Sequence, residues 1–140
     1  MNIDSIKNGI VLDHIRAGRG MQIYNSLGLD QLDCSVAIIK NVKSRKTGRK
    51  DIIKIDADIE IDLGVLGYLD PGITVNRIVN GEIVEKKHLE LPERVVNIIR
   101  CKNPRCITSV EPELDQVFQL SDRLAGKYRC LYCEEKYEKK

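Results

Sequence analysis

The sequence is poor in aromatic side chains, has no long apolar run and carries no large excess of either charge. It has no tryptophan and one phenylalanine, and aromatics make up 4% of its 140 residues, so platforms for stacking nucleic-acid bases are scarce. Lysine and arginine number 23 against 21 aspartates and glutamates, and the net charge of +2 neither indicates nor excludes a polyanionic partner. No apolar run approaches the length of about 18 residues that a membrane helix needs.

The N-terminal residues Met-Asn-Ile-Asp-Ser-Ile-Lys lack the basic-then-apolar order of a signal peptide. We therefore expect a cytoplasmic protein without membrane attachment, in which cysteines stay reduced. Hydrophobic residues make up 42% of the composition, enough for a core that must be mainly aliphatic. The length suits one ordinary domain or two small ones.

Four of the five cysteines form two closely spaced pairs, Cys101 with Cys106 and Cys130 with Cys133. Thiolates at these spacings suit one tetrahedral Zn²⁺, although two disulfides or four unrelated thiols would use the same residues. Because a reducing compartment favours metal over disulfides, we predict one zinc ion per chain, bound by these four cysteines. Four protein ligands leave no position for water, so the zinc would be structural. Cys34 stands alone and is expected to be a small buried side chain.

Residues 1–92 predict an α+β domain. Strands are expected, from β-branched content and alternation, at residues 9–15, 33–42, 51–55, 74–79 and 82–87. Helices are expected over residues 18–28 and from Ile61 to just before Pro71, and residues 43–50 are expected to form a basic turn. Asn80-Gly81 predicts a type I′ hairpin. This order suits a ferredoxin-like antiparallel sheet with both helices on one face and one added strand.

Residues 93–140 predict a separate, small all-β zinc-binding domain, and the boundary falls within the Leu91-Pro-Glu-Arg94 segment. Its expected strands are residues 95–99, 116–120 and 127–131. A unit of this size seldom folds without a disulfide or a bound metal, and structural zinc contributes on the order of 10–16 kcal/mol to the folding free energy of comparable peptides. That exceeds the net stability of a typical domain, so we expect the metal to decide whether this unit folds.

Five motifs, in order and over nearly the full length, resemble the regulatory chain of aspartate carbamoyltransferase. They are Ile10-Val-Leu-Asp-His-Ile15, Gly48-Arg-Lys-Asp-Ile-Ile-Lys-Ile55, Thr74-Val-Asn-Arg-Ile78, Leu91-Pro-Glu-Arg94 and the two cysteine pairs. The resemblance implies a regulatory subunit of pyrimidine biosynthesis with no catalytic residues. It also implies an N-terminal domain that binds the nucleotide effectors ATP, CTP and UTP. The zinc domain would contact the catalytic chain, and two regulatory chains would pair as a dimer.

The same resemblance implies most of the site residues. Those for the nucleotide are Ile3, Asp4, Ile6, Val11, Asp13, His14, Lys54, Asn76, Ile78, Ile83 and Lys86, and Asn103 matches a contact position for the catalytic chain. Lys50, in the basic run near Lys54, is expected to add positive charge to the nucleotide pocket, and Arg105 of the zinc loop and Glu134 are expected to complete the surface against the catalytic chain. A triphosphate suits cations such as Lys54 and Lys86 and a protonatable His14. Taken alone, Lys86 would more often be an ordinary exposed lysine, and Lys50 would more often belong to a solvated turn.

The hairpin geometry sets a condition on Lys86. In a regular hairpin centred on Asn80-Gly81, Asn76 faces Glu85, and Lys86 then points to the opposite side of the sheet. Asn76 and Lys86 can reach one ligand only if the strand bulges between about residues 83 and 86, or if the ligand wraps round a sheet edge. We predict the bulge.

Two other function classes compete with the regulatory one. A zinc-ribbon nucleic-acid-binding protein would use the same cysteine pairs, but the near-neutral charge, the few aromatics and the acidic Glu134-Glu135 beside the last ligand disfavour it. A metalloenzyme is disfavoured because four cysteines leave no open metal position, and only His14 and His88 are available elsewhere.

Overall fold

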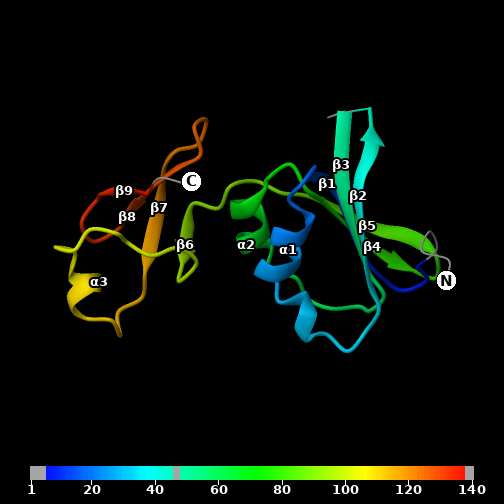
Figure 1. Ribbon diagram of the computed structural model, residues 1–140, viewed down its shortest axis with the longest axis horizontal. Helices are drawn as coiled ribbons and strands as arrows, with labels where there is room; N and C mark the ends of the chain where they lie inside the picture. The colour runs from blue at the N-terminus through cyan, green and yellow to red at the C-terminus, as the bar shows by residue number, and fades with distance from the viewer. Residues whose placement is uncertain (1–5, 46–47, 138–140) are drawn as a thin grey trace. The chain divides into compact units, whose positions relative to one another are not determined.

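The computed structural model describes residues 6–45 and 48–137, and the chain divides into two compact units, residues 1–90 and residues 91–140. The elements of each unit are labelled in Figure 1. In the described part of the chain the longest helices have 7 residues, and none is long and apolar enough to span a membrane.

The first unit is a five-stranded antiparallel sheet with two helices on one face (Figure 1). Its elements are β1 (Gly9–Arg16), α1 (Gly20–Ser26), the short 3-10 helix η1 (Leu29–Gln31), β2 (Val36–Ser44), β3 (Gly48–Ile55), α2 (Leu63–Leu69), β4 (Thr74–Val79) and β5 (Glu82–His88). The strand order is β2-β3-β1-β4-β5. The first four strands therefore have the ferredoxin-like arrangement, and β5 is the added edge strand, which confirms the predicted α+β fold.

Aliphatic side chains fill the space between the sheet and the helices. Leu12 and Ile53 of the sheet and Ile23 and Leu66 of the helices are at most 1% exposed. Burying a side chain of this size contributes about 1.5–3 kcal/mol, so a few such contacts hold these short helices in place. The Asp62 side chain caps α2 by accepting a hydrogen bond from the Val65 backbone N–H at 3.1 Å.

The strand β3 is flanked by two bulges, one in each of its neighbours β1 and β2. The register of β1 on β3 shifts between Leu12 and Ile15, and that of β2 on β3 shifts between Ile39 and Val42. His14 and Asn41, one in each bulge, have left-handed φ angles of 60° and 61°. Both bulges are irregularities that pattern-based strand prediction does not register.

A carboxylate stabilises each bulge. Asp13 accepts the His14 backbone N–H at 2.7 Å. The fully buried Asp51 accepts the backbone N–H groups of Asn41, Gly18 and Gly20 at 2.9, 3.1 and 2.9 Å. Asp51 thus connects the start of α1 to the bulge in β2.

The strands β2 and β3 extend further than the sequence predicts. β2 continues to Ser44 and β3 begins at Gly48, so Arg49 and Lys50 are strand residues. The predicted basic turn over residues 43–50 is therefore wrong in its extent. At the two ends of this range, Lys43 pairs with Arg49 and Ser44 pairs with Gly48.

The β4–β5 hairpin has the turn and the irregularity that were predicted. Asn80 and Gly81 have φ angles of 52° and 79°, as a type I′ turn requires. Ile78 pairs with Ile83, but the next pair is Arg77 with Glu85, which leaves Val84 as an extra residue in β5. The predicted bulge is confirmed.

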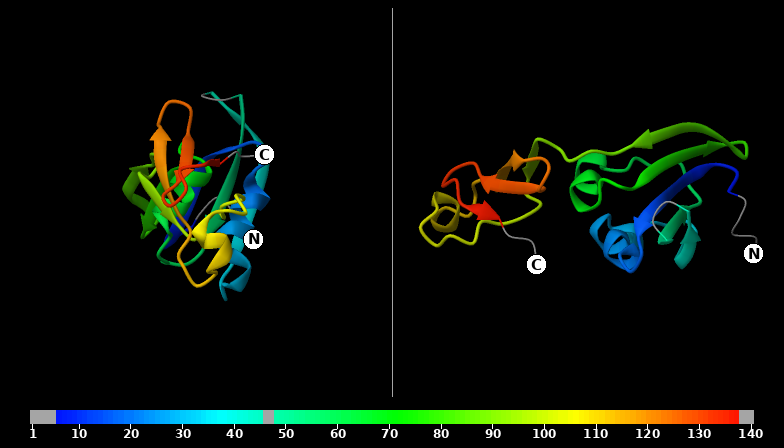
Figure 2. Two further views of the ribbon diagram at one scale, coloured as in Figure 1. Left: turned by 90° about the vertical axis from the view of Figure 1, so that its left-hand side faces the viewer. Right: turned by 90° about the horizontal axis from the view of Figure 1, so that it is seen from above.

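The second unit is a four-stranded antiparallel sheet with one turn of helix. Its elements are β6 (Arg94–Val96), α3 (Ile107–Val110), β7 (Val117–Asp122), β8 (Lys127–Cys130) and β9 (Lys136–Tyr137), with the strand order β6-β7-β8-β9 (Figure 2). Phe118 and Tyr128 are each 1% exposed and form its core with the buried Cys106 and Cys130. The short elements α3 and β9 were not predicted, because neither is long enough to show a periodicity.

Candidate functional site

The sulfurs of the two cysteine pairs converge in the second unit. The Sγ atoms of Cys101, Cys106, Cys130 and Cys133 all lie within 4.8 Å of one another. Zinc–sulfur bonds of about 2.3 Å in a tetrahedron imply sulfur separations of about 3.8 Å. The Cys101–Cys133 and Cys106–Cys130 separations of 3.5 and 3.7 Å fit this geometry, and both are too long for a disulfide bond. The four thiols are therefore arranged to hold one structural metal ion, as zinc requires.

Local hydrogen bonds prepare one of these thiols to ionise. Burial raises the pKa of the Cys101 thiol to about 12, and burial also raises the pKa of Cys130. Burial acts in the same sense on Cys106, but hydrogen bonds from the Thr108 hydroxyl and backbone outweigh it and lower the pKa of Cys106 to about 7. The Thr108 hydroxyl donates to Cys106 Sγ at 3.1 Å. Cys106 is thus the thiol best prepared to bind a cation as a thiolate.

The loops that close around the sulfurs carry the three residues expected to contact a catalytic chain. Asn103 Oδ1 accepts the Arg105 backbone N–H at 3.0 Å, and the Asn103 carbonyl accepts the Ser109 hydroxyl at 2.8 Å. Glu134 has a left-handed φ of 62°, and its backbone N–H donates to the Cys130 carbonyl at 2.9 Å. The side chains of Arg105 and Glu134 are exposed, so both are available at the surface next to the metal centre.

A second candidate site lies on the face of the first sheet opposite α1 and α2, which we call the outer face. Val11 of β1 pairs with Lys54 of β3 on one side and with Asn76 of β4 on the other. Asn76 in turn pairs with Lys86 of β5, because the extra residue Val84 shifts the register. Directly paired residues share a face, so these four side chains form one row across four strands.

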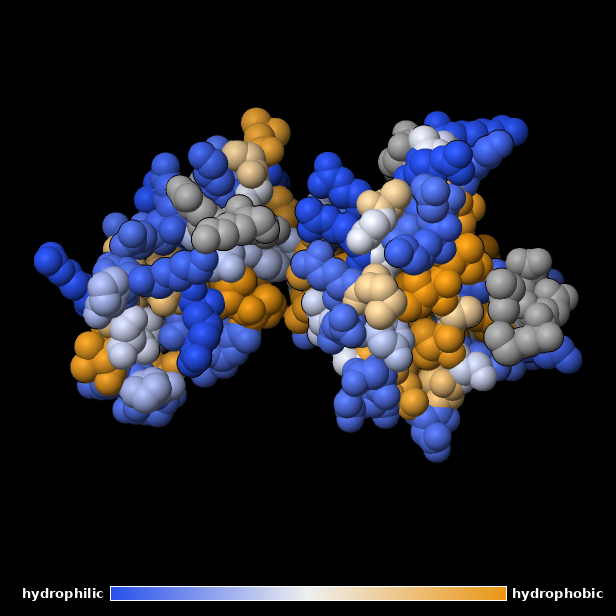
Figure 3. All heavy atoms as spheres, viewed as in Figure 1, coloured by the Kyte–Doolittle hydropathy of each residue, from blue (hydrophilic) through white to orange (hydrophobic). Residues whose placement is uncertain are grey.

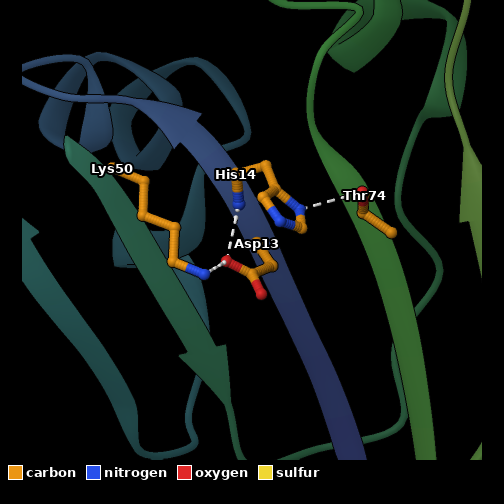
Figure 4. Close-up of polar contacts among 4 residues, drawn as sticks. All are labelled: Asp13, His14, Lys50 and Thr74. Atoms are coloured by element: carbon orange, nitrogen blue, oxygen red, sulfur yellow. Dashed lines mark hydrogen bonds and ion pairs between the residues drawn. The ribbon is translucent and has the colours of Figure 1, made fainter. Parts of the chain in front are cut away.

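A neighbouring row carries more polar groups. Asp13 of β1 pairs with Thr74 of β4, and Thr74 pairs in turn with His88 of β5. Figure 4 shows the Lys50 ammonium directed at Asp13 and the His14 ring directed at Thr74. The Lys50 Nζ–Asp13 Oδ1 distance is 2.8 Å, and His14 Nδ1 lies 3.2 Å from Thr74 Oγ1.

The carboxyl group of Asp13 is held in its ionised form. Burial acts to raise its pKa, but the hydrogen bonds from Lys50 and from the His14 backbone outweigh burial and lower the pKa below its ordinary value of 3.8. The ionised carboxylate keeps the Lys50 ammonium on the outer face.

The opposite end of the outer face is apolar. Ile78 and Ile83 are paired there, next to the turn at Asn80-Gly81. The Gly81 N–H donates to the Lys7 carbonyl at 2.9 Å, so the segment before β1 lies beside this turn, with the half-buried Ile6 in it. Two further predicted site residues, Ile3 and Asp4, lie outside the described residues.

Asn76 has an unsatisfied acceptor in the middle of the row. The residue is 7% exposed, and its side-chain oxygen Oδ1 is buried with no hydrogen-bond partner in the part of the chain that the structure describes. A buried acceptor left unpaired costs about 1–3 kcal/mol. Because Lys54 and Lys86 belong to the same row, the outer face suits an anionic ligand that also carries an N–H or O–H donor.

The structure therefore gathers most of the predicted nucleotide-site residues. The outer face holds Val11, Asp13, Lys50, Lys54, Asn76, Ile78, Ile83 and Lys86, and His14 lies in the bulge of β1 next to Asp13. Sequence reasoning missed Thr74 and His88. Both follow from the hairpin register, since they are the next positions on the face of Asn76 and Lys86.

Comparison with known proteins covers both units. Residues 1–90 match the family model described as "Aspartate carbamoyltransferase regulatory chain, allosteric domain". Residues 93–140 match the model for the metal binding domain of the same chain.

Curated relatives are similar over nearly the whole sequence. The aspartate carbamoyltransferase regulatory chain of Clostridium botulinum strain Hall is 54% identical over 137 residues, 98% of this chain and 94% of the relative. The chains of the same name from Clostridium tetani and Bifidobacterium longum are 52% and 46% identical, over 99% and 96% of this chain and 96% and 97% of theirs. These findings favour the family resemblance over the alternative of a nucleic-acid-binding zinc ribbon.

Proposed function

Since the chain belongs to the family of aspartate carbamoyltransferase regulatory chains, we propose that its first unit binds nucleotide effectors and its second unit binds the catalytic chain. The effectors are ATP, CTP and UTP, and they bind within the domain of residues 1–92. Zinc bound by the four cysteines organises the domain of residues 93–140. The chain itself performs no catalysis, and it acts in the cytoplasm.

The unpaired Oδ1 of Asn76 carries the proposal for the effector site. It lies in one row with Lys54 and Lys86, where a hydrogen-bond donor would satisfy Oδ1 and an anion would lie close to two ammonium groups. Nucleotides supply the anion in their phosphates and the donor in ribose hydroxyls or amino groups. A nucleotide on this row would satisfy Asn76 and be held by two charge-assisted contacts.

The polarity of the outer face gives the nucleotide a direction. Ile78 and Ile83 form the apolar end, which suits the flat base. Lys86 and His14 lie toward the polar end, which suits the phosphates, and Lys50 adds positive charge there while bound to Asp13. The ribose then lies near Asn76, and the first phosphate lies within reach of Lys54 in the same row.

The effector site is tested by nucleotide titration calorimetry on the full chain with zinc. The substitution Lys54→Ala should weaken the binding of ATP and CTP several-fold more than it weakens the binding of the corresponding nucleosides. Lys43→Ala is the matched control, because Lys43 is an exposed lysine at the end of β2, away from the row. Equal loss of nucleotide and nucleoside would remove Lys54 from phosphate binding, and loss in the control alone would contradict the site.

Exposed apolar side chains support a protein partner for the second unit. Six large hydrophobic residues of this small unit are exposed, namely Val96, Ile107, Val110, Leu124, Leu131 and Tyr132. Leu124 lies in the β7–β8 turn, whose tip is hydrophobic in Figure 3. Apolar surface of this kind marks protein–protein contact sites. Together with the exposed Arg105 and Glu134 beside the metal centre and with Asn103, it forms the proposed surface for the catalytic chain.

The metal would supply a fixed centre that ties the loop of residues 101–106 to the end of β8. Asn103 and Arg105 lie within that loop, and Glu134 follows the last cysteine. Their positions therefore depend on the four thiolates being held together. This is how a structural ion would control assembly without taking part in chemistry.

We also propose that two regulatory chains pair as a dimer and that effectors act by population shift. The edge strands β2 and β5 of the first sheet offer a surface for pairing, and Ile83 and Val84 of β5 are 61% and 59% exposed. Effectors that bind two quaternary states with different affinity would shift the enzyme between them, whereas equal affinity would shift nothing. Sedimentation of the isolated chain tests the dimer.

A further inference from the structure

We propose that His88 is a phosphate-binding residue of the effector site and that it contacts the outer phosphates of a nucleoside triphosphate. The inference rests on the proposed nucleotide site and adds a residue to it. His88 ends β5, is exposed, and pairs directly with Thr74 of β4. It therefore lies on the outer face, one position beyond Lys86 on that face.

The surroundings of His88 suit an anion. Thr74 is 1% exposed and lies between His88 on β5 and Asp13 on β1. His14 reaches the same threonine at 3.2 Å, so two imidazoles flank one hydroxyl. Other charged groups at this end are Lys50, which is paired with Asp13, Lys86, and Arg16, which pairs with Lys50 across β1 and β3. A second carboxylate, Asp70, lines one hollow with His14 and Arg16 and accepts the backbone N–H groups of Arg16 and Gly72. Asp13 is thus already matched by Lys50 and Asp70 by two backbone donors, and the other groups are hydrogen-bond donors or cations for a phosphate.

The position of His88 along the strand decides which phosphates it reaches. The apolar pair Ile78 and Ile83 begins the outer face, the row of Asn76 and Lys86 follows, and the row of Thr74 and His88 comes next. Four residues of extended strand, from Ile78 to Thr74, span about 13 Å. A nucleotide with its base on the isoleucines brings its outer phosphates to the row of Thr74 and His88, beyond a monophosphate.

Lys87 provides a control from the same strand. It is adjacent to His88 and also exposed, but it pairs with Val75, and its Nζ lies 3.0 Å from Glu85 Oε1 on the other face of the sheet. Charge loss at Lys87 changes the overall electrostatics of β5 next to His88, without touching the outer face. Long-range effects are thereby separated from a direct contact.

The test is calorimetric titration of the full zinc-loaded chain with ATP and with AMP, using the wild type and the variants His88→Gln, His88→Arg and Lys87→Gln. We expect His88→Gln to weaken ATP about fivefold and AMP less than twofold, as the loss of one exposed charge-assisted contact would. His88→Arg should restore ATP binding to within about twofold, and Lys87→Gln should leave both ligands unchanged within about twofold.

Four outcomes would overturn the proposal. ATP binding that is unchanged in His88→Gln, or reduced equally in Lys87→Gln, would show that His88 makes no contact. Equal weakening of ATP and AMP would place His88 away from the outer phosphates. If the wild type binds neither nucleotide, the proposed effector site itself fails and the assignment of His88 fails with it. Unchanged thermal unfolding of each variant shows that binding, and not folding, is measured.

Discussion

Asn76 of β4 and Lys86 of β5 are directly paired, because Val84 adds one residue to β5 between the turn and this pair. In a regular hairpin without this bulge, Asn76 would face Glu85, and the Lys86 side chain would point to the helix-covered face. The bulge instead places Lys86 and His88 on the outer face and leaves Glu85 and Lys87 on the other. One unpaired residue thus decides which of two adjacent lysines can reach a ligand next to Asn76.

The two adjacent lysines should therefore behave differently. Lys86→Ala should weaken ATP about tenfold, equivalent to about 1.4 kcal/mol, because it removes a charge-assisted contact next to Asn76. Lys87→Ala should change ATP affinity less than twofold. Both affinities can be measured by fluorescence competition on the full chain. Similar losses in the two variants would mean that net charge, and not the register of β5, governs binding.

The pairing of Asp13 with Lys50 predicts a pH dependence of stability. The pKa of folded Asp13 lies below its ordinary value of 3.8, so its ionised carboxylate stabilises the fold at pH values above 3.8. This contribution is lost as the pH falls through the folded-state pKa. Asp13→Asn should be less stable than the wild type near neutral pH, and the difference should shrink as the pH drops below about 4.

Hydrogen exchange at the amides of β1 and β3 measures this difference in the first unit alone. Acid also releases metal from thiolates, but that process affects the second unit. A difference between Asp13→Asn and the wild type that stays constant from neutral pH to pH values below 3.8 would contradict the assigned role of the carboxylate.

Asp51 should be among the most sensitive positions of the first unit. It is fully buried and accepts three backbone N–H groups, from Gly18, Gly20 and Asn41. Asp51→Ala leaves these donors unpaired and should lower the free energy of unfolding by roughly 3 kcal/mol or more, whereas Asp51→Asn keeps one acceptor and should cost less. Urea denaturation measures both. The exposed Asp56 is the control, and its alanine variant should change stability by less than about 0.5 kcal/mol.

Removing one cysteine sulfur should separate the two functions of the chain. Cys106→Ser should leave nucleotide binding largely intact, because the outer face is built within residues 1–90. It should abolish assembly with the catalytic chain, because Cys106 is buried among the four sulfurs that would hold the zinc loop. Metal content and size-exclusion chromatography with the catalytic subunit measure this. Cys34→Ser serves as the control, and assembly of Cys106→Ser would show that the division of functions is wrong.

Much of this molecule could be predicted from local signals in the sequence. The spacing of Cys101, Cys106, Cys130 and Cys133 predicted the cluster that the structure shows, since thiol ligands at these spacings have few other uses. Asn80-Gly81 predicted the hairpin turn, because both residues take positive φ angles. These signals are strong because each depends on the covalent geometry of a few neighbouring residues.

Features that depend on tertiary pairing could not be read in the same way. The bulges at His14 and Asn41 are stabilised by Asp13 and Asp51, and the hydrogen bond from the Asn41 N–H to Asp51 joins different strands. His88 and Thr74 entered the site only through the register of β5, which no local pattern specifies once a residue is inserted. The basic run at residues 43–50 was too polar to predict as strand, yet pairing of β2 with β3 extends into it.

The central claim is that this chain couples nucleotide binding to an enzyme through a metal-dependent unit. The most direct measurement is co-purification with the aspartate carbamoyltransferase catalytic subunit, with and without a chelator, followed by titration of the purified complex with ATP and CTP. We expect stoichiometric assembly only with bound zinc, and an activity of the complex that responds to nucleotide. Assembly that persists after the metal is removed, or a complex whose activity ignores both nucleotides, would contradict it.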